Sequence, residues 1–380
     1  MSTRKVVIFR DKLLPASETF VKAQAEGLSD FTPYYVGYQR IKNSLALSEE
    51  RTYTIHNIGT RLHNKYSEKW LKKWLINTMI YKEIKRIDPK LIHAHFGPDG
   101  TLALPIAQKL NIPLIVTFHG YDVTRSIDHL KSDNAYNIKH YVRHMDALQE
   151  SDAVFIAASD FIKRKLVEKG FSNDQIITHY IGVDLETLKV DHSITREDSV
   201  LFVGRLVKNK GCEYLIQAMK MVNDKYPNTR LIIAGDGPER QRLEQLAGDL
   251  NINASFLGAI SHKDVVLEMN KAKVFSVPSI EIESGASEGF GMVFAEAQAM
   301  ALPAVSFDTG GIPEAISHNE TGFIVPQKDH KQLADSIIKL LSDVSLWDKF
   351  SSNAVEHVNE CFNLKKQNNK LEEIYNSILS

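Results

Sequence analysis

Short apolar runs alternate with longer amphipathic stretches along most of the chain. In the first half, runs rich in β-branched and aromatic side chains predict strands at residues 6–9, 33–37, 91–94, 114–118, 153–157 and 175–180. In the second half, the corresponding runs lie at residues 200–204, 230–234, 254–257, 274–277, 304–307 and 323–325. Segments with helical periodicity lie between many of these strands, at residues 17–28, 102–110, 138–150, 159–169, 212–226, 238–250, 263–271, 293–301 and 331–341. This alternation predicts an α/β protein whose parallel sheets are covered by helices on both faces.

A polar stretch without apolar periodicity at residues 182–198 interrupts the alternation, and we interpret it as a linker. The expected architecture is therefore two doubly wound, Rossmann-like domains that face a cleft, with residues 1–185 in the first domain and residues 186–362 in the second. Helical patterns follow at residues 347–360 and 364–379. Ligands of such sheets bind at the carboxyl ends of the strands, so the loops after the strands are where chemistry is expected.

Composition indicates a soluble protein of more than one domain. The 380 residues are 43% hydrophobic and 24% charged, which excludes wholesale disorder and supplies apolar material for two cores. No apolar run approaches the roughly 18 residues that span a bilayer, and the run at residues 6–9 is too short for a signal peptide. Cys212 and Cys361 are the only cysteines, too few for a disulfide framework or a four-thiolate zinc site. We therefore expect a cytoplasmic protein.

The formal net charge of −1 conceals an asymmetry between the two halves. Residues 1–185 carry 26 Lys and Arg against 20 Asp and Glu, a balance of +6, and residues 186–380 carry 20 against 27, a balance of −7. A basic half is typical of proteins that bind an anionic membrane or nucleic acid, and a solvated surface is the simpler explanation.

Residues 65–86 concentrate the positive charge, with seven Lys or Arg against two Glu. At 100° per residue one face of this segment carries Tyr66, Trp70, Trp74, Tyr81 and Ile84. Two interpretations remain open: a helix that lies in an anionic membrane interface, and a core helix whose second apolar face is Leu71, Leu75 and Met79.

Two loops of the second half carry glycine and positive charge at strand ends. Residues 204–211 read GRLVKNKG and place Arg205 and Lys210 on a connection that suits a diphosphate, although a solvated basic loop has the same composition. Residues 234–238 read AGDGP, and Gly235 there allows close approach of the backbone to a ligand. The dinucleotide-binding fingerprint and the Walker phosphate loop are both absent.

The segment 287–297 reads SEGFGMVFAEA and has the strongest functional signal. Glu288 lies on a glycine-rich turn and Glu296 lies about two helical turns later, so the N-terminus of the helix suits an anion and the carboxylates suit sugar hydroxyls. Residues 285–289 also match the G-x-S-x-G nucleophile elbow of serine hydrolases, with Asp308 and His318 in triad order. That elbow requires a strand that ends directly at Ser287, whereas the predicted strand ends at residue 277.

Histidines gather at strand ends of the first half. His119 follows the strand at 114–118 and is placed to reach into a cleft, and His93 and His95 flank a second strand end. Zinc binding by the three histidines is one interpretation, and packing is the other. The sequence has neither an H-E-x-x-H motif nor two aspartates separated by one residue, so we expect no metal site.

Taken together, these motifs resemble the retaining glycosyltransferases of family four, which have the two-domain GT-B fold. The resemblance rests on His119-Gly120 and on the segments GRLVKNKG, AGDGP, E288-x7-E296 and GGIPE at 310–314, which lie in the family's order over most of the chain. Residues 17–21 (SETFV) and 93–97 (HAHFG) look like the subset that builds bacterial surface polysaccharides, of the colanic acid or exopolysaccharide type.

The resemblance implies roles for individual residues. Arg205 and Lys210 would hold the diphosphate of a nucleotide-sugar, Glu296 would accept hydrogen bonds from the ribose, and His119 would approach the sugar from the other domain. Glu288 would grip the transferred sugar and the nearby phosphate together with the N–H groups of Phe290, Gly291, Met292 and Val293. Gly289 on the same turn is a further donor-binding candidate. Many members have a Gly-Gly pair after the first strand, where this chain has residues 15–18, PASE, so a role for Ser17 is uncertain.

The function implied is the metal-independent transfer of a hexose-type sugar from a nucleotide-sugar to a saccharide or lipid-linked saccharide, with no cofactor and no nucleic acid partner. UDP-sugars are the commoner donors of the family, and GDP-sugars remain open. The C-terminal domain would bind the donor, the N-terminal domain and a returning helix at 363–380 the acceptor, and the protein would lie at the inner face of the plasma membrane. A GT-B nucleotide-sugar epimerase, a non-catalytic sugar-nucleotide-binding protein and a serine hydrolase at Ser287 are the alternatives.

Overall fold

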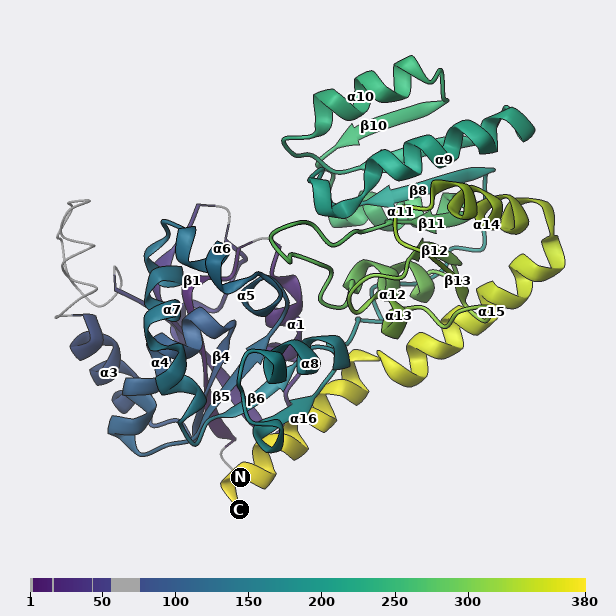
Figure 1. Ribbon diagram of the computed structural model, residues 1–380. Helices are drawn as coiled ribbons and strands as arrows, with labels where there is room; N and C mark the ends of the chain where they lie inside the picture. Colours follow the sequence, from purple (N-terminus) through teal and green to yellow (C-terminus); the bar gives the residue numbers. More distant parts are fainter. Residues whose placement is uncertain (1–2, 16, 43, 56–75) are drawn as a thin grey trace. The chain divides into compact units, whose positions relative to one another are not determined.

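The computed structural model describes residues 3–15, 17–42, 44–55 and 76–380, whose contacts divide the chain into two units (Figure 1). The N-terminal unit comprises Met1–Gly182 together with Leu364–Ser380, and the C-terminal unit comprises Val183–Asn363. Each unit contains one sheet, and every strand pair in both sheets is parallel. The prediction of an α/β fold with two doubly wound parallel sheets is confirmed.

The sheet of the N-terminal unit has seven strands in the order β3-β2-β1-β4-β5-β6-β7. Their bounds are β1 (Arg4–Leu13), β2 (Phe31–Arg40), β3 (Thr52–Thr54), β4 (Leu91–His95), β5 (Leu114–Phe118), β6 (Val154–Ala157) and β7 (Ile176–Thr178). The helices are α1 (Thr19–Glu26), α3 (Ile76–Ile87), α4 (Gly97–Leu110), α5 (Tyr121–Thr124), α6 (Ile127–Ser132), α7 (Tyr136–Gln149), α8 (Asp160–Glu168) and α16 (Leu364–Leu379).

Successive side chains of β1 enter two different cores because a strand points them to opposite faces. Val7 and Phe9 belong to the core on the face of α3, α4, α7 and α8. Val6 and Ile8 belong to the core that α1 and α16 complete. All four side chains are at most 1% exposed, so residues 6–9 of β1 form a continuous apolar run, as expected for a strand covered on both faces.

The helix α16 belongs to the N-terminal unit although it follows the C-terminal unit in the sequence. Its Tyr375 hydroxyl lies 2.6 Å from His93 Nδ1 in the sheet. Its Glu372 carboxylate accepts hydrogen bonds from the backbone N–H groups of Ser29 and Asp30, at 2.8 and 2.6 Å. Polar contacts therefore fix the position of this helix as well as its apolar side chains.

The sheet of the C-terminal unit has six strands in the order β10-β9-β8-β11-β12-β13. Their bounds are β8 (Ser199–Val203), β9 (Arg230–Ala234), β10 (Ala254–Gly258), β11 (Val274–Ser276), β12 (Ala304–Phe307) and β13 (Gly322–Val325). The helices are α9 (Cys212–Lys225), α10 (Arg240–Asp249), α11 (His262–Lys271), α12 (Met292–Ala299), α13 (Ile312–Ala315), α14 (His330–Ser342) and α15 (Val344–Cys361). The helix α9 packs against α10 and α14, and α12 packs against α13 and α15.

Both sheets change direction at their first strand. In the N-terminal unit β1 lies between β2 and β4, and in the C-terminal unit β8 lies between β9 and β11. The connections therefore diverge between β1 and β4, and between β8 and β11. The carboxyl ends of these strand pairs are the topological switch points, where open α/β sheets bind their ligands.

The structure adds elements that the sequence pattern did not predict. The edge strand β3 has three residues, too few to show a period, and α5, α6 and α13 are each six residues or shorter. The helix α4 begins at Gly97, earlier than the predicted start at residue 102, because Pro98 fits a first helical turn. A Cβ on Gly97 would lie 2.6 Å from the Phe118 ring, so glycine there lets α4 approach the sheet closely.

Part of the basic segment 65–86 lies outside the described residues, namely 65–75. Its remainder lies in α3, where Ile80 and Ile84 are buried against the N-terminal core and Lys82, Lys85 and Arg86 are exposed. A search of the described residues for a helix with the length and apolarity to cross a bilayer finds none.

Candidate active site

The loops that follow β8 and β11 lie against each other in the C-terminal unit. Gly211 has φ of +63°, and a Cβ there would be 1.8 Å from the carbonyl oxygen of Pro278. The Ile280 N–H donates a hydrogen bond of 2.9 Å to the Asn209 carbonyl. This close approach is open only to glycine, and it places the turn that carries Lys210 beside the loop after β11.

Lys210 and Glu288 form an ion pair across these two loops. The Lys210 ammonium donates to Glu288 Oε2, and the Ser279 hydroxyl donates to the same oxygen at 3.4 Å. The side chains of Lys210 and Glu288 are 19% and 16% exposed. Lys210 and Glu288 were predicted as donor-binding residues from two separate sequence motifs. The structure brings them together at the switch point of the C-terminal sheet.

The glycine pair at 310 and 311 packs against the backbone of the turn at Glu288. Gly310 has φ of +62°, and a Cβ there would lie 2.1 Å from the Glu288 carbonyl oxygen. The Gly311 N–H donates to that same oxygen at 3.0 Å. The family motif at 310–314 includes this pair, to which the sequence alone assigned no role, and the structure shows that it positions Glu288.

The helix α12 begins immediately after this turn. Gly291 is its N-cap in a left-handed conformation, with φ of +87°. The N–H groups of the first helical turn, which includes Met292 and Val293, have no acceptor within the helix, and the helix dipole is positive at this end. The end of α12 beside the Lys210–Glu288 pair therefore has the electrostatics of an anion site.

Glu296 lies on α12, within the same unit. Desolvation by burial raises the pKa of its carboxyl group to about 7. In the described part of the chain its carboxylate forms no ion pair or hydrogen bond, so its charge is uncompensated. Such a carboxylate is suited to accept hydrogen bonds from a ligand.

Arg205 and Gly235 lie beside each other at the strand ends. A Cβ on Gly235 would lie 1.8 Å from the carbonyl oxygen of Gly204, the residue before Arg205. Arg205 itself is exposed, and its guanidinium makes no ion pair with any residue that the structure describes. Of the two cations predicted to hold a diphosphate, Lys210 is therefore paired and Arg205 is open to solvent.

In the N-terminal unit the three histidines form one column at the ends of β4 and β5. The rings of His93 and His95 stack with centroids 4.4 Å apart, and His95 Nδ1 lies 3.0 Å from His119 Nε2. His93 is also hydrogen bonded to the Thr117 hydroxyl at 2.6 Å. Burial lowers the pKa of His93 to about 3 and the pKa values of His95 and His119 well below the usual 6.5, so the column is neutral near pH 7.

The histidine column is not arranged as a metal site. Among residues 3–15, 17–42, 44–55 and 76–380, no group of three or more His, Cys, Asp and Glu side chains is placed to hold a metal ion. Both ring nitrogens of His93 are used for hydrogen bonds, and His95 Nδ1 and His119 Nε2 lie within hydrogen-bond distance of each other.

Sequence reasoning missed a buried charge network at the switch point of the N-terminal sheet. The Arg10 guanidinium forms ion pairs with Glu18 and Asp99, and it donates to the His95 carbonyl oxygen at 3.2 Å. Arg10 is 7%, Glu18 8% and Asp99 1% exposed. The available signal was the Arg10-Asp11 pair in an apolar strand, because a charge at a buried position requires a partner.

Ser287 does not have the surroundings of a catalytic nucleophile, and a role for Ser17 stays a prediction. Ser17 is exposed in the turn before α1. The Ser287 hydroxyl is buried, with no hydrogen-bond partner among the described residues, and His318 Nδ1 accepts from the Ile324 N–H. Because β11 ends at Ser276 and α12 begins at Met292, the strand–nucleophile–helix turn of a serine hydrolase is absent at Ser287.

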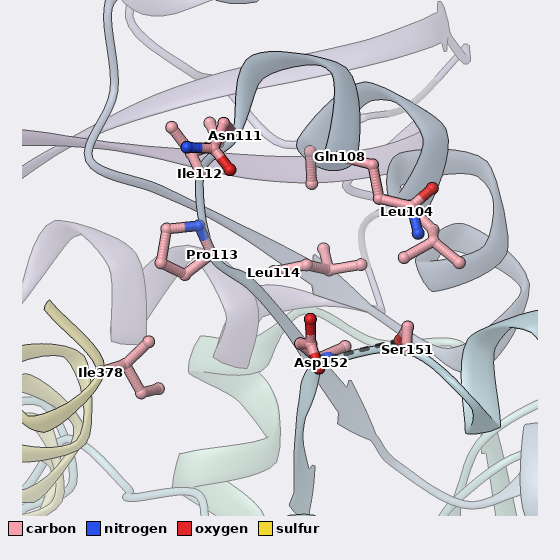
Figure 2. Close-up of a pocket in the computed structure, with 11 residues that line it drawn as sticks. Leu104, Gln108, Asn111, Ile112, Pro113, Leu114, Ser151, Asp152 and Ile378 are labelled. Atoms are coloured by element: carbon pink, nitrogen blue, oxygen red, sulfur yellow. Dashed lines mark hydrogen bonds between the residues drawn. The ribbon is translucent and has the colours of Figure 1, made fainter.

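A pocket of about 500 Å³ lies in the N-terminal unit, at the ends of the strands opposite to the histidine column (Figure 2). Its lining includes Pro113 and Leu114 at the start of β5, Asp152 before β6, and Ile378 of α16. These are the amino ends of the strands, whereas the residues predicted to bind ligands lie at the carboxyl ends. This pocket is therefore separate from the candidate active site.

Comparison with known proteins identifies the family. A family model described as "Glycosyl transferases group 1" matches residues 185–357, and one described as "Glycosyltransferase Family 4" matches residues 36–187. An uncharacterized glycosyltransferase of Methanocaldococcus jannaschii is 30% identical over 270 residues, which are 70% of this chain and 69% of that protein. The chain belongs to glycosyltransferase family 4.

Other relatives of this glycosyltransferase agree with the assignment. The capsular polysaccharide biosynthesis glycosyltransferase CapM of Staphylococcus aureus is 28% identical over 306 residues, 74% of each chain. Among solved structures, HepE of Anabaena in complex with UDP superposes with a TM-score of 0.78 at 18% identity, covering 99% of this chain and 100% of HepE. At that identity the likeness establishes the shared fold.

Proposed function

We propose that this glycosyltransferase transfers a hexose-type sugar from a UDP-sugar to a saccharide or lipid-linked saccharide acceptor in surface polysaccharide biosynthesis, with retention of configuration. The relatives support the setting, since CapM is named for capsular polysaccharide biosynthesis. The solved structure of HepE in complex with UDP supports a uridine nucleotide. The resemblance to retaining family-four enzymes supports the stereochemistry.

The Lys210–Glu288 pair beside the N-terminus of α12 is the observation that carries the proposal. Sugar transfer requires departure of a nucleoside diphosphate, and negative charge builds on its β-phosphate as the glycosidic bond breaks. Fixed cations and N–H dipoles that face this charge lower the barrier. Lys210, Arg205 and the N–H groups at the start of α12 supply both kinds of group within one unit.

The remaining residues have roles in holding the substrates. Glu288 binds hydroxyls of the transferred sugar, Glu296 binds the ribose, and the loop at Gly235 lies against the nucleotide. For His119, which is neutral near pH 7 and whose Nε2 lies 3.0 Å from His95 Nδ1, the resemblance to the family supports a contact with the sugar near its reacting carbon. The proposed reaction needs no metal or other cofactor, because these cations and dipoles stabilise the negative charge of the leaving group.

A peripheral location on the inner face of the plasma membrane is part of the proposal. It is supported by the +6 balance of residues 1–185 and by the exposed Lys82, Lys85 and Arg86 of α3. Flotation of the protein with liposomes tests it, because binding is expected with anionic lipid and not with neutral lipid. Binding that does not depend on anionic lipid would contradict this part.

Calorimetric titration with UDP and with GDP, in the presence of EDTA, tests the donor class and metal independence. We expect UDP to bind, and to bind more weakly to the Lys210→Ala and Glu296→Gln variants. Lys208→Ala is the matched control, since Lys208 is exposed on the same turn as Lys210. Tight binding of GDP alone would show that the donor is a GDP-sugar and not a UDP-sugar. Binding of neither nucleotide would contradict the proposed function.

A further inference from the structure

Four aromatic rings meet at the carboxyl ends of β4 and β5, beside the start of α1. The His119 ring centroid lies 4.6 Å from that of Phe96 and 5.0 Å from that of Phe20. The Phe96 centroid lies 5.1 Å from that of Tyr121. We call Phe20, Phe96, His119 and Tyr121 the aromatic cluster.

The members of the aromatic cluster differ in exposure. Phe96 is 6% exposed and Phe20 and His119 are half-buried, whereas Tyr121 is 42% exposed. Within the part of the chain that the structure describes, no other Phe, Tyr or Trp side chain is exposed to this degree. An aromatic ring kept at the surface beside buried aromatic rings is available to a ligand.

Hydrogen bonds fix the turn that carries Tyr121. The Asp122 carboxylate accepts hydrogen bonds from the N–H groups of Gly97 and Gly120, at 2.9 and 3.0 Å, and so ties together the two turns that carry Phe96 and Tyr121. The Arg10 guanidinium lies 4.4 Å from the Phe96 ring centroid. A platform that is already ordered loses little conformational entropy when a ligand binds.

Polar groups lie close to the same ring. Arg10, which lies over the neighbouring Phe96 ring, forms ion pairs with Glu18 and Asp99. In the described part of the chain, His119 Nδ1 and Asp99 Oδ1 are buried without a hydrogen-bond partner. A buried polar atom in this state costs free energy, which a hydrogen bond from a ligand hydroxyl recovers.

A pyranose ring matches this combination of groups. It presents C–H bonds on its faces and hydroxyl groups at its rim. The C–H bonds, which carry slight positive charge, are attracted to the negative face of an aromatic ring, and the hydroxyls bond to carboxylate and imidazole groups. A flat apolar protein surface would gain the stacking but would leave the buried polar atoms unpaired.

We propose that the aromatic cluster forms the acceptor subsite of this glycosyltransferase, with a pyranose ring of the acceptor stacked on the exposed face of Tyr121. This inference rests on the proposed function and deepens it by naming the residue that recognises the acceptor. Stacking depends on the shape of the ring, so Tyr121 determines affinity for a six-membered sugar while the polar atoms beside it distinguish the hydroxyls.

Saturation-transfer difference NMR on the full chain, with UDP present, tests the subsite. The probes are the methyl glycosides of glucose, galactose, mannose and N-acetylglucosamine. We expect the wild type and Tyr121→Phe to transfer saturation to at least one glycoside, most strongly to the C–H protons of one ring face. In Tyr121→Ala the affinity for that glycoside should fall about threefold to tenfold.

Two results would overturn the subsite. One is the absence of saturation transfer to every glycoside from the wild-type protein. The other is equal transfer from the wild type and Tyr121→Ala. That result would indicate that the exposed ring contacts a protein and not a sugar. Tyr226→Ala, at the end of α9 in the C-terminal unit, is the matched control and should behave as the wild type.

The affinities for UDP and GDP, measured on the same samples, separate this inference from the proposed function. Unchanged UDP affinity in Tyr121→Ala together with the expected threefold to tenfold fall in glycoside affinity supports the subsite. Unchanged UDP affinity with unchanged transfer removes the subsite and leaves the proposed function intact. A wild-type protein that binds neither nucleotide contradicts the proposed function, whatever the glycosides show.

Discussion

Lys210 and Glu288 are 78 positions apart in the sequence and form an ion pair between the loops that follow β8 and β11. Arg10 and Asp99 form the corresponding pair in the N-terminal unit, between the end of β1 and the helix that follows β4. Each pair joins the two strands at which the connections of its sheet diverge. Under the proposed function, the diphosphate of the donor would share Lys210 with Glu288.

Lys210→Ala is expected to lower turnover by about 10²–10³-fold, the usual effect of removing one group that stabilises charge in the transition state. The measurement is the rate of UDP release with saturating donor and acceptor, together with the unfolding transition. Lys208→Ala should retain the wild-type rate. A Lys210→Ala protein that is folded and turns over at the wild-type rate would remove Lys210 from the mechanism.

Gly310→Ala is expected to lower turnover by about 10²-fold, because an added Cβ would lie 2.1 Å from the Glu288 carbonyl oxygen and displace the turn. Gly248→Ala is the contrasting change. Gly248 lies in α10 with no atom within 4 Å of an added Cβ, so alanine there should raise the free energy of unfolding by about 0.5–1 kcal/mol. Equal activity of the two variants would show that the glycine pair does not position Glu288.

The raised pKa of Glu296 predicts proton release on nucleotide binding. With a pKa of about 7, the carboxyl group is mostly protonated at pH 6 in the free protein, and hydrogen bonds from a ribose favour its ionised form. Binding therefore releases a proton at pH 6, and affinity should rise with pH until it levels off above about pH 7.

Titration of UDP in buffers of different ionisation enthalpy measures that proton. The terminal phosphate of UDP titrates near pH 6 as well, so the informative quantity is the difference between the wild type and Glu296→Gln. We expect the wild type to release close to one additional proton at pH 6 and none at pH 8. Identical proton release by both proteins at pH 6 would place Glu296 outside the ribose contact.

Tyr375→Phe is expected to lower the free energy of unfolding by about 1–3 kcal/mol, because it leaves His93 Nδ1 buried without its 2.6 Å partner. Urea denaturation followed by circular dichroism measures the change. Tyr34→Phe serves as the control, since the half-buried Tyr34 hydroxyl makes no hydrogen bond to a described residue. A loss no greater than that of the control would show that the contact does not stabilise α16.

Most strands could be predicted from the sequence because parallel strands buried on both faces are continuous apolar runs. The bounds of β5, β9 and β12 are the same in the prediction and in the structure. The start of α4 could not be predicted, since Gly97 and Gly100 are typical of a loop. Glycine is required at these two positions because α4 packs closely on the sheet, and added Cβ atoms would lie within 2.8 Å of the Phe118 and Val116 side chains.

The candidate site could be predicted as separate motifs and not as an arrangement. Lys210 and Glu288 each follow a predicted strand, but their contact depends on the close approach of backbone at Gly211 and Gly310, which no local pattern encodes. The Arg10–Asp99 pair spans 89 positions and lacks any local signal beyond a charge in an apolar strand. Long-range pairing is a property of the packed structure.

The return of α16 to the N-terminal unit has a consequence for biogenesis. The C-terminal unit is one uninterrupted stretch, Val183–Asn363, and can fold on the ribosome as soon as it has emerged. The N-terminal unit is translated first, yet the core that contains Val6 and Ile8 lacks Leu371 and Tyr375 until residues 364–380 are synthesised. The half of the enzyme that is made first is therefore the half that is completed last. Until α16 is synthesised, the apolar face that it covers is exposed and available to chaperones.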